Sequence, residues 1–368
     1  MNTPHLTFSI PIRIAGRMVG PGHPPFVVAE LSGNHNGLLA RALALIDAAK
    51  AAGADAVKLQ TYTAETITLD CDGAPFRIEG GPWHGQRLYD LYREASTPWE
   101  WHEALFAHCR AQGLACFSTP FDASAVAFLE RFDPPAHKIA SFELVDLPLI
   151  RRAAATGRPL ILSTGMASAS EIDEAVGAAR EAGCQNLILL HCVSAYPAPP
   201  AQSRLRAIAN LSARHNVPAG LSDHSLGTAV AVAAVALGAV FIEKHLTLSR
   251  ADGGPDAGFS LEPAEFTALV RNCRSAWEAM NGATEGQGEA TEAELSCRRL
   301  RRSLFVAADM AAGEAFTEAN VRSVRPADGL PPKHLPAILG ARATRPIARG
   351  TPLAWDMVSS APSSSGPA

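Results

Sequence analysis

Two histidines with acidic neighbours are the residues of this sequence best suited to chemistry. His224 follows Asp223, and His245 lies two residues after Glu243. Side chains two apart share a face of a strand, so Glu243 and His245 would lie together. Neutral imidazole commonly binds Mn, Zn, Fe or Co, and a nearby carboxylate can act as a base. The pattern predicts a two-histidine divalent-metal site with Glu243 as acid/base. The alternative is that each histidine is a hydrogen-bonded residue at a strand end.

The stretch 220–246, GLSDHSLGTAVAVAAVALGAVFIEKHL, predicts how the two histidines come together. Two short apolar runs flank a Gly/Ala-rich segment long enough for one helix, which indicates a strand, a helix and a strand. A crossover of this length joins parallel strands, whose carboxyl ends meet at one edge. Residues 222–224 would end one strand and residues 243–245 the next, placing the histidines side by side.

Two lysines within predicted strands suggest an anionic ligand. Lys58 and Gln60 share a face in VKLQT, and Lys138 lies in HKIAS. A lysine that points into a barrel is costly unless it is paired, so two of them favour a phosphate with a carboxylate. Hydroxyl donors follow nearby strands at Ser141, Ser163 and Thr164. The alternative is an ion pair of each lysine with a strand-end carboxylate such as Glu30 or Glu143.

Eight short apolar runs separated by amphipathic segments define the predicted fold class. Several of the segments end in a glycine or asparagine that stops a helix, such as Gly53 and Asn216. Strands and helices alternating over roughly 220 residues predict a TIM (β/α)8 barrel rather than an open doubly wound sheet. In such a barrel the chemistry lies at the C-terminal strand ends. The candidate strands are Phe26–Glu30, Ala56–Thr61, Ala115–Pro120, His137–Ser141, Leu160–Thr164, Leu187–Val193, Pro218–Ser222 and Val240–Leu246.

The sequence also predicts how the chain divides into domains. Residues 1–281 are assigned to the barrel domain, with an N-terminal hairpin at 6–19. Residues 282–302 are a linker, 303–358 a small domain of short strands and turns, and 359–368 a disordered tail. The long break at 63–97 would cover or shape a site at the catalytic face, or be a surface insertion.

Composition and charge exclude several classes of protein. The net charge of -4 over 368 residues shows no basic excess, so nucleic acid is not an expected partner. The seven cysteines form no CxxC pair and are odd in number, which favours a reduced, cytoplasmic protein. The sequence shows neither a signal peptide nor an 18-residue apolar span, so no membrane association is expected. It also lacks a GxGxxG or Walker pattern, so dinucleotide binding is unsupported.

Several ordered blocks of the sequence resemble the sialic acid synthase family. The resemblance covers almost the whole chain and implies a TIM barrel followed by the family's small antifreeze-like (SAF) domain, to which SVRPADGLPPKHL (323–335) is similar. The barrel blocks are AELSGNHNG (29–37), GADAVKLQTY (53–62), FSTPFD (117–122), KIASFE (138–143), LSTGMA (162–167), LSDHSLG (221–227) and IEKHLTL (242–248).

The resemblance implies a role for each matching residue. His224 and His245 match the metal ligands, with Mn2+ expected and Mg2+ or Co2+ as the alternatives. Glu243 matches the catalytic carboxylate, and Glu30, on the sugar side, is counted with it. The residues expected to bind phosphoenolpyruvate or the sugar are Lys58, Gln60, Thr119, Lys138, Ser141, Ser163, Ser194, Tyr196, Ser222, Asp256 and Arg325. Arg325 matches an arginine that the SAF domain delivers into the partner subunit's site, which implies a domain-swapped homodimer.

The activity implied by the resemblance is that of a phosphoenolpyruvate-dependent nonulosonic acid synthase. The block GGPWHGQRLYDLYREASTPWEWH (80–102) is similar to the branch that uses a diacetamido trideoxy sugar. Ser194 stands where neuraminate synthases usually have asparagine, which weakens an assignment to N-acetylmannosamine. The expected reaction condenses phosphoenolpyruvate with 2,4-diacetamido-2,4,6-trideoxy-L-altrose and water to give pseudaminate and phosphate. The alternatives are synthesis of N-acetylneuraminate or legionaminate, a pyruvate aldolase, and a non-catalytic sugar-binding relative.

Overall fold

The computed structural model describes residues 10–282 and 290–359. The chain divides into two compact units, Met1–Gly282 and Ala283–Ala368, each of which is described by itself. Residues 6–9 of the predicted hairpin, 283–289 of the predicted linker and 360–368 of the predicted tail lie outside the described residues.

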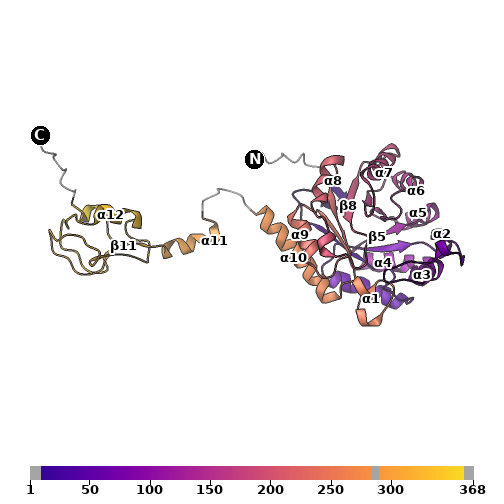
Figure 1. Cartoon of the computed structure of the whole chain (residues 1–368), viewed down its shortest axis with the longest axis horizontal. Coiled ribbons are helices and arrows are strands. Elements are labelled where there is room, and N and C mark those ends of the chain that lie inside the picture. Colours follow the sequence, from indigo (N-terminus) through magenta and orange to yellow (C-terminus); the bar gives the residue numbers. More distant parts are fainter. Residues whose placement is uncertain (1–9, 283–289, 360–368) are drawn as a thin grey trace. The chain divides into compact units, whose positions relative to one another are not determined.

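Eight parallel strands close into a barrel in the first unit, which confirms the predicted fold class (Figure 1). Each strand pairs with the next along the chain, and the last pairs with the first. Several predicted strand ends, including Ser141 and Leu246, lie just beyond the observed strands. The strands are β3 (Phe26–Glu30), β4 (Ala56–Thr61), β5 (Ala115–Pro120), β6 (His137–Ile139), β7 (Leu160–Ser163), β8 (Leu187–Cys192), β9 (Ala219–Asp223) and β10 (Phe241–His245).

Helices surround the barrel because the outward face of each strand is apolar. Val27, Ala29 and Val57 pack there with buried helix residues such as Leu45 and Leu105 in one large core. The helices are α1 (Leu39–Ala51), α4 (His102–Ala111), α5 (Ala123–Leu129), α6 (Leu147–Ala154), α7 (Ala169–Glu181), α8 (Ala207–His215), α9 (Ala229–Ala236) and α10 (Pro263–Asn281).

The inward face of each strand changes from apolar to polar along its length. In β10 the apolar Phe241 is followed at two-residue intervals by Glu243 and His245. In β3, Phe26 likewise begins a series that ends in Glu30, and its ring lies 5.5 Å from that of Phe241. The lower half of the barrel is therefore a packed core, and the polar groups collect at the C-terminal strand ends.

A short hairpin closes the lower end of the barrel. Strands β1 (Ile12–Ile14) and β2 (Arg17–Val19) pair antiparallel, with Ala15 and Gly16 at positive φ in the turn. The apolar side chains of Ile12, Ile14 and Val19 join the interior core. The hairpin thus seals the end of the barrel opposite the polar strand ends.

The predicted break at 63–97 contains two helices, α2 (Ala64–Ile67) and α3 (Leu88–Ala95). We call residues 63–97 the insertion. Arg87 holds it together: its guanidinium lies 3.0 Å from Asp70, 2.9 Å from Asp72 and 2.7 Å from Asp90. The insertion therefore has defined structure of its own between β4 and α4.

The second unit has its own small core. Strands β11 (Ser303–Val306) and β12 (Val321–Val324) pair antiparallel, and the short helix α12 (Leu335–Ile338) follows. Leu304, Val306, Phe316 and Ile338 are buried together. Within the predicted linker, α11 (Glu292–Leu295) forms one short helix. No described helix in either unit combines the length and apolar character needed to cross a lipid bilayer.

Candidate active site

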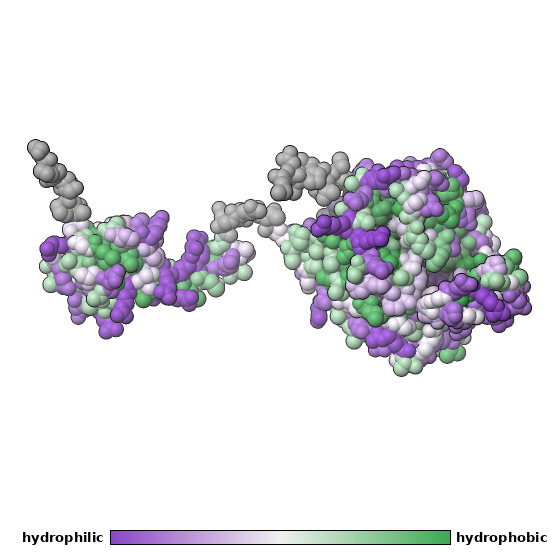
Figure 2. All heavy atoms as spheres, in the orientation of Figure 1, coloured by the Kyte–Doolittle hydropathy of each residue, from purple (hydrophilic) through white to green (hydrophobic). Residues whose placement is uncertain are grey.

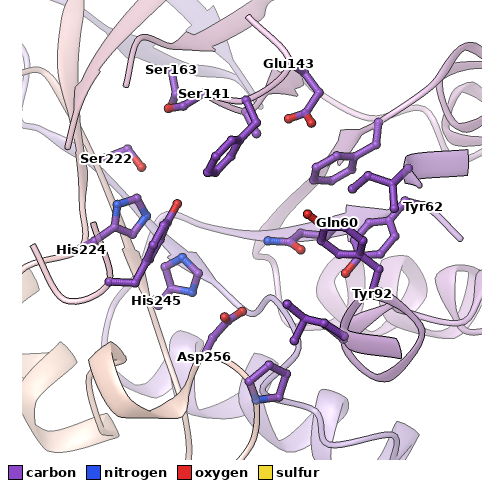
Figure 3. Close-up of a pocket in the computed structure, with 18 of the residues that line it drawn as sticks. Gln60, Tyr62, Tyr92, Ser141, Glu143, Ser163, Ser222, His224, His245 and Asp256 are labelled. Atoms are coloured by element: carbon purple, nitrogen blue, oxygen red, sulfur yellow. The ribbon is translucent and has the colours of Figure 1, made fainter. Parts of the chain in front are cut away.

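The barrel closure brings most of the predicted site residues to one cavity. Strand register places His245 beside Glu30, Glu30 beside Lys58, and Glu243 beside Ser222. A cavity of about 330 Å³ opens at these strand ends (Figure 3), within the usual size range of a small-molecule site. Its lining includes the predicted residues Lys58, Gln60, Lys138, Ser141, Ser163, Tyr196, Ser222, His224, Glu243, His245 and Asp256.

Two buried lysines and two buried carboxylates form a compact charged group in the cavity. Lys58 Nζ lies 2.5 Å from Glu30 Oε2 and 3.3 Å from Glu243 Oε1. Lys138 Nζ donates to the same Glu243 oxygen at 3.2 Å. Thr119 accepts a hydrogen bond from Lys58 at 3.0 Å. The carboxylates therefore balance the lysines when the cavity holds no anion, as the ion-pair alternative for Lys58 and Glu30 anticipated.

The electrostatics of this group favour an ionised Glu243. Burial alone would raise the pKa of Glu243, but Lys138 and Lys58 together hold it below its usual range. Burial raises the pKa of Glu30, with Lys58 acting against that change. Burial also lowers the pKa of Lys138. Of the two carboxyl groups, Glu30 is therefore the one more easily protonated.

His224 and His245 lie side by side, with ring centroids 5.3 Å apart. His224 Nδ1 is 3.3 Å from the Val193 carbonyl, and His245 Nδ1 is 3.2 Å from Ser32 Oγ. Each contact occupies Nδ1 and leaves the opposite ring nitrogen, Nε2, available to bind a ligand. Burial holds the pKa of His245 well below its usual value, so this imidazole is neutral, as a metal ligand must be.

The residues around the histidines limit what else could complete a metal site. Within residues 10–282 and 290–359, no group of three or more His, Cys, Asp or Glu side chains converges as a full set of metal ligands. Cys192 Sγ lies 3.7 Å from His224 Nδ1. Burial lowers the pKa of His224, but Cys192, the Val193 carbonyl and Glu243 together raise it above its usual value. The chain thus offers two imidazoles, and substrate or water would supply the remaining ligands.

Serine hydroxyls surround the charged group. Ser222 Oγ donates to Glu243 at 3.2 Å, and the Gly165 amide donates to Ser141 Oγ at 3.1 Å. Ser163 Oγ is buried without a hydrogen-bond partner among the described residues. A Cβ at Gly165 would lie 2.3 Å from Ser194 Oγ, so only glycine lets this backbone approach so closely. These groups form a ready set of donors for an anion.

Some predicted residues lie away from the cavity surface. Glu30 and Thr119 lie behind Lys58 and contact it, and Ser194 Oγ lies 3.7 Å from Cys192 Sγ. Arg325 follows β12 in the second unit, where it is exposed. Its predicted contribution to a partner subunit's site stays a prediction.

The structure adds cavity-lining residues that were not among the predicted site residues. Tyr62, Tyr92, Phe121 and Phe142 line the cavity, together with Glu143, whose Oε2 is buried without a partner. Burial raises the pKa of Glu143 to about 7. Tyr62 was within reach of sequence reasoning, because it continues the alternation from Lys58 and Gln60. The apolar lining residues Ile67, Ile78, Trp83, Leu88 and Leu91 all come from the insertion. In α3 the spacing of Leu88, Leu91 and Tyr92 is that of one helix face, a local signal that could have found these residues.

A closed parallel barrel with buried lysines, carboxylates and imidazoles at its C-terminal strand ends defines the class as a TIM-barrel enzyme. The chain belongs to the NeuB family, whose profile matches residues 45–285, and a SAF domain profile matches residues 301–359. Both matches confirm the family and the SAF domain anticipated from the sequence.

Individual relatives are similar over most of the chain. A pseudaminic acid synthase of Campylobacter jejuni is 44% identical, covering 89% of this chain and 95% of the relative. A pseudaminic acid synthase of Helicobacter pylori is 42% identical, covering 90% of this chain and 97% of the relative. An N,N'-diacetyllegionaminic acid synthase of C. jejuni is 35% identical, covering 87% of this chain and 96% of the relative. Among solved structures, an N-acetylneuraminic acid synthetase of Leptospira borgpetersenii has a TM-score of 0.70 with 32% identity, covering 79% of this chain and 96% of that one.

Proposed function

We propose that the protein is a pseudaminic acid synthase. It would condense phosphoenolpyruvate with 2,4-diacetamido-2,4,6-trideoxy-L-altrose and water to give pseudaminate and phosphate. The observation that carries the proposal is Glu243, which bridges Lys58 and Lys138 in the cavity that also holds both imidazoles. The greater similarity to pseudaminic acid synthases than to a legionaminic acid synthase supports the choice of sugar.

Phosphoenolpyruvate would bind where the lysines and serines meet. Its phosphate and carboxylate are anions, and Lys58 and Lys138 are buried cations whose charge the carboxylates of Glu30 and Glu243 balance. Ser163 Oγ is a buried donor with no described partner, and Ser222 donates only to Glu243 among the described residues. Fixing both anionic groups places the enol carbon of phosphoenolpyruvate in one position. The loss of its translational and rotational freedom then occurs on binding, which lowers the activation barrier of the reaction.

His224 and His245 would hold a divalent metal, Mn2+ in our proposal, with their Nε2 atoms. The fit rests on their adjacency, on the neutral state of His245, and on the Nδ1 contacts that leave each Nε2 free to bind. Such an ion, when bound, supplies Lewis-acid polarisation of the aldehyde oxygen of the sugar. Ser32 and the Val193 carbonyl orient the two rings for this role.

Glu243 would act on the water of the reaction. Attack of the enol carbon on the aldehyde forms the carbon–carbon bond, the aldehyde oxygen takes up a proton to become a hydroxyl, and a cation-like centre is left at the carbon that bears phosphate. Water adds to that carbon and one of its protons passes to Glu243. The carbon–oxygen bond to phosphate then breaks, and the remaining hydroxyl becomes the ketone as its proton leaves with the phosphate. Glu243 is ionised between the two lysines and so can accept a proton. Glu30, whose pKa burial raises, is proposed as the second acid/base group on the sugar side.

The SAF domain would complete the site from a partner subunit. We propose a domain-swapped homodimer in which Arg325 of one chain enters the cavity of the other. Arg325 is exposed in its own unit, and its guanidinium suits a sugar acid or an acetamido oxygen.

The test is phosphate release by the purified protein with phosphoenolpyruvate, Mn2+ and each candidate sugar supplied separately. Release with the altrose-configured diacetamido sugar alone is expected, and a chelator should abolish it. Release with N-acetylmannosamine or the legionaminate precursor instead would overturn the choice of sugar but keep the reaction class. No release with phosphoenolpyruvate, but product formation when pyruvate replaces it, would identify a pyruvate aldolase and refute the proposal.

A further inference from the structure

We propose that the insertion, residues 63–97, is the specificity element of this enzyme. Its inward face would bind the end of the sugar that carries the C4 acetamido group and the C6 methyl group. This inference rests on the proposed function and assigns the residues that select the sugar. The residues that carry it are Ile67, Ile78, Trp83, Leu88, Leu91 and Tyr92, all of which line the cavity.

The cavity has two chemically different ends (Figure 3). Ser222, His224 and His245 lie at one end, while Tyr62 and Tyr92 lie at the other. The anion donors and the imidazoles fix phosphoenolpyruvate and the aldehyde carbon at the first end. The rest of the open-chain sugar must then extend toward the tyrosines, because the packed barrel core closes the lower side.

The second end is apolar on the side that the insertion supplies. Ile67, Ile78 and Leu88 are half-buried against the cavity, and Leu91 is buried behind them. The outer surface of the same segment is hydrophilic, and such residues gather over the region of α2 and α3 in Figure 2. A segment only inserted at the surface would not need to present one apolar face to the cavity and a polar one to solvent.

This lining matches the chemistry that distinguishes the proposed sugar. A 2,4-diacetamido-2,4,6-trideoxy sugar carries a methyl group at C6 and an acetamido group at C4, where N-acetylmannosamine carries hydroxyls. Methyl groups gain free energy against apolar side chains, whereas a hydroxyl there loses water without a partner. The apolar end of the cavity, which we call the chamber, therefore favours the diacetamido trideoxy sugar at both C4 and C6.

Contacts with neighbouring loops hold the insertion in a defined position beside the cavity. Trp83 Nε1 donates to the Pro255 carbonyl at 2.9 Å, and its ring lies 5.4 Å from that of Tyr196. The Ile78 amide donates to the Gln86 carbonyl at 2.9 Å, which closes a tight loop around Trp83. The two Trp83 contacts join the insertion to the loops after β8 and β10. They hold the inward face of the insertion at a fixed distance from the histidines.

Ile78→Thr tests the proposal, because it replaces the ethyl group of a half-buried side chain by a hydroxyl and so removes apolar contact from the cavity lining. We expect kcat/KM for the diacetamido trideoxy sugar to fall roughly tenfold, the scale of one methyl-sized contact. The KM for phosphoenolpyruvate should stay unchanged. Ile67→Thr, on a different part of the insertion, should act in the same direction. Leu69→Thr is the matched control, because Leu69 is 64% exposed and absent from the cavity lining.

No loss in either lining variant, or an equal loss in Leu69→Thr, would overturn the assignment of the insertion. A separate binding measurement distinguishes this failure from failure of the proposed function. In saturation-transfer NMR, the C6 methyl and acetamido methyl signals of the sugar should be saturated by the wild-type protein and weakened by Ile78→Thr. Saturation of the methyl signals without phosphate release would refute the proposed reaction but support the assignment of the insertion. Phosphate release with unsaturated methyl signals would support the reaction but refute the assignment of the insertion.

Discussion

Glu243 joins the two halves of the proposed reaction. It is buried between Lys58 and Lys138 and lies two residues before His245, on the same inward face of β10. When an anion binds the lysines, their hold on the carboxylate weakens and Glu243 becomes a stronger base. The side chain would thus be ionised before substrate binds and able to accept a proton after it.

Glu243→Gln should separate binding from turnover. The amide keeps the shape but removes the negative charge that competes for the lysines, so affinity for phosphoenolpyruvate should be retained or increase. Turnover should fall by ~10²- to 10⁴-fold, the usual contribution of proton transfer. Calorimetry gives the affinity and phosphate release gives the rate. Glu103→Gln, an exposed carboxylate on α4, is the control, and unchanged turnover in Glu243→Gln would remove Glu243 from catalysis.

Glu143 should make the stability of the protein depend on pH near neutrality. Burial raises its pKa to about 7, so between pH 4.5 and 7 the folded protein retains a proton that the unfolded chain has lost. The stabilisation is complete below pH 4.5 and is lost as the pH rises through 7, by about 3 kcal/mol in the free energy of unfolding. Urea unfolding from pH 4.5 to 8 should show this loss in the wild type and not in Glu143→Gln. Parallel curves for the two proteins would contradict it.

The insertion acts as one element because a single arginine gathers its acidic residues. Arg87 contacts Asp70, Asp72 and Asp90, which would otherwise repel one another. This cluster adds to the Trp83 contacts that position the apolar side chains facing the cavity. We therefore expect residues that never contact the sugar to influence its recognition.

Arg87→Gln should loosen the insertion while leaving the barrel intact. We expect the KM for the sugar to rise about tenfold, less than the ~10² that a 1 Å misplacement can cost, with the KM for phosphoenolpyruvate unchanged. Arg93→Gln is the control, because Arg93 contacts only one of the three aspartates, Asp90 at 3.3 Å, and its side chain is 68% exposed. Steady-state kinetics with each substrate varied in turn measures both constants. A parallel rise in both would show general damage to the site.

At the scale of the whole molecule, the two units have separate cores, and the proposed function needs both. The barrel unit holds the charged group and the histidines, while Arg325 lies in the SAF unit. Delivery from a partner subunit makes the active site a property of the dimer. That arrangement can be distinguished from delivery within one chain.

Mixing two inactive variants tests the proposed swap. In a heterodimer of Glu243→Gln and Arg325→Ala, delivery from the partner leaves one site with both wild-type residues. Statistical exchange of subunits in an equal mixture should then restore about one quarter of wild-type phosphate release. Delivery within one chain would give no rescue. Size-exclusion chromatography of each variant confirms that both remain dimers, and absence of rescue despite exchange would refute the swap.

Local patterns in the sequence were enough for the barrel and for most of the site. Strand alternation alone placed Glu243 with His245 and Lys58 with Gln60, because the side-chain period of a strand is two. Repetition of strand and helix indicated the barrel, and barrel geometry puts polar strand ends at one mouth. The resemblance to a family then supplied the roles that those residues are proposed to play.

Only the tertiary structure decided which groups meet and how the cavity ends. Lys138 and Glu243 are 105 positions apart and share a hydrogen bond because closure of the barrel brings β6 and β10 across from each other. The partnerless oxygen of Glu143 depends on contacts with distant segments. The helical spacing of Leu88 and Leu91 marks an apolar face of the insertion, but only the fold turns that face toward the cavity. The sequence determined the chemistry available to this protein, and the fold decided its pairing, because distances between strands are set by closure and not by spacing along the chain.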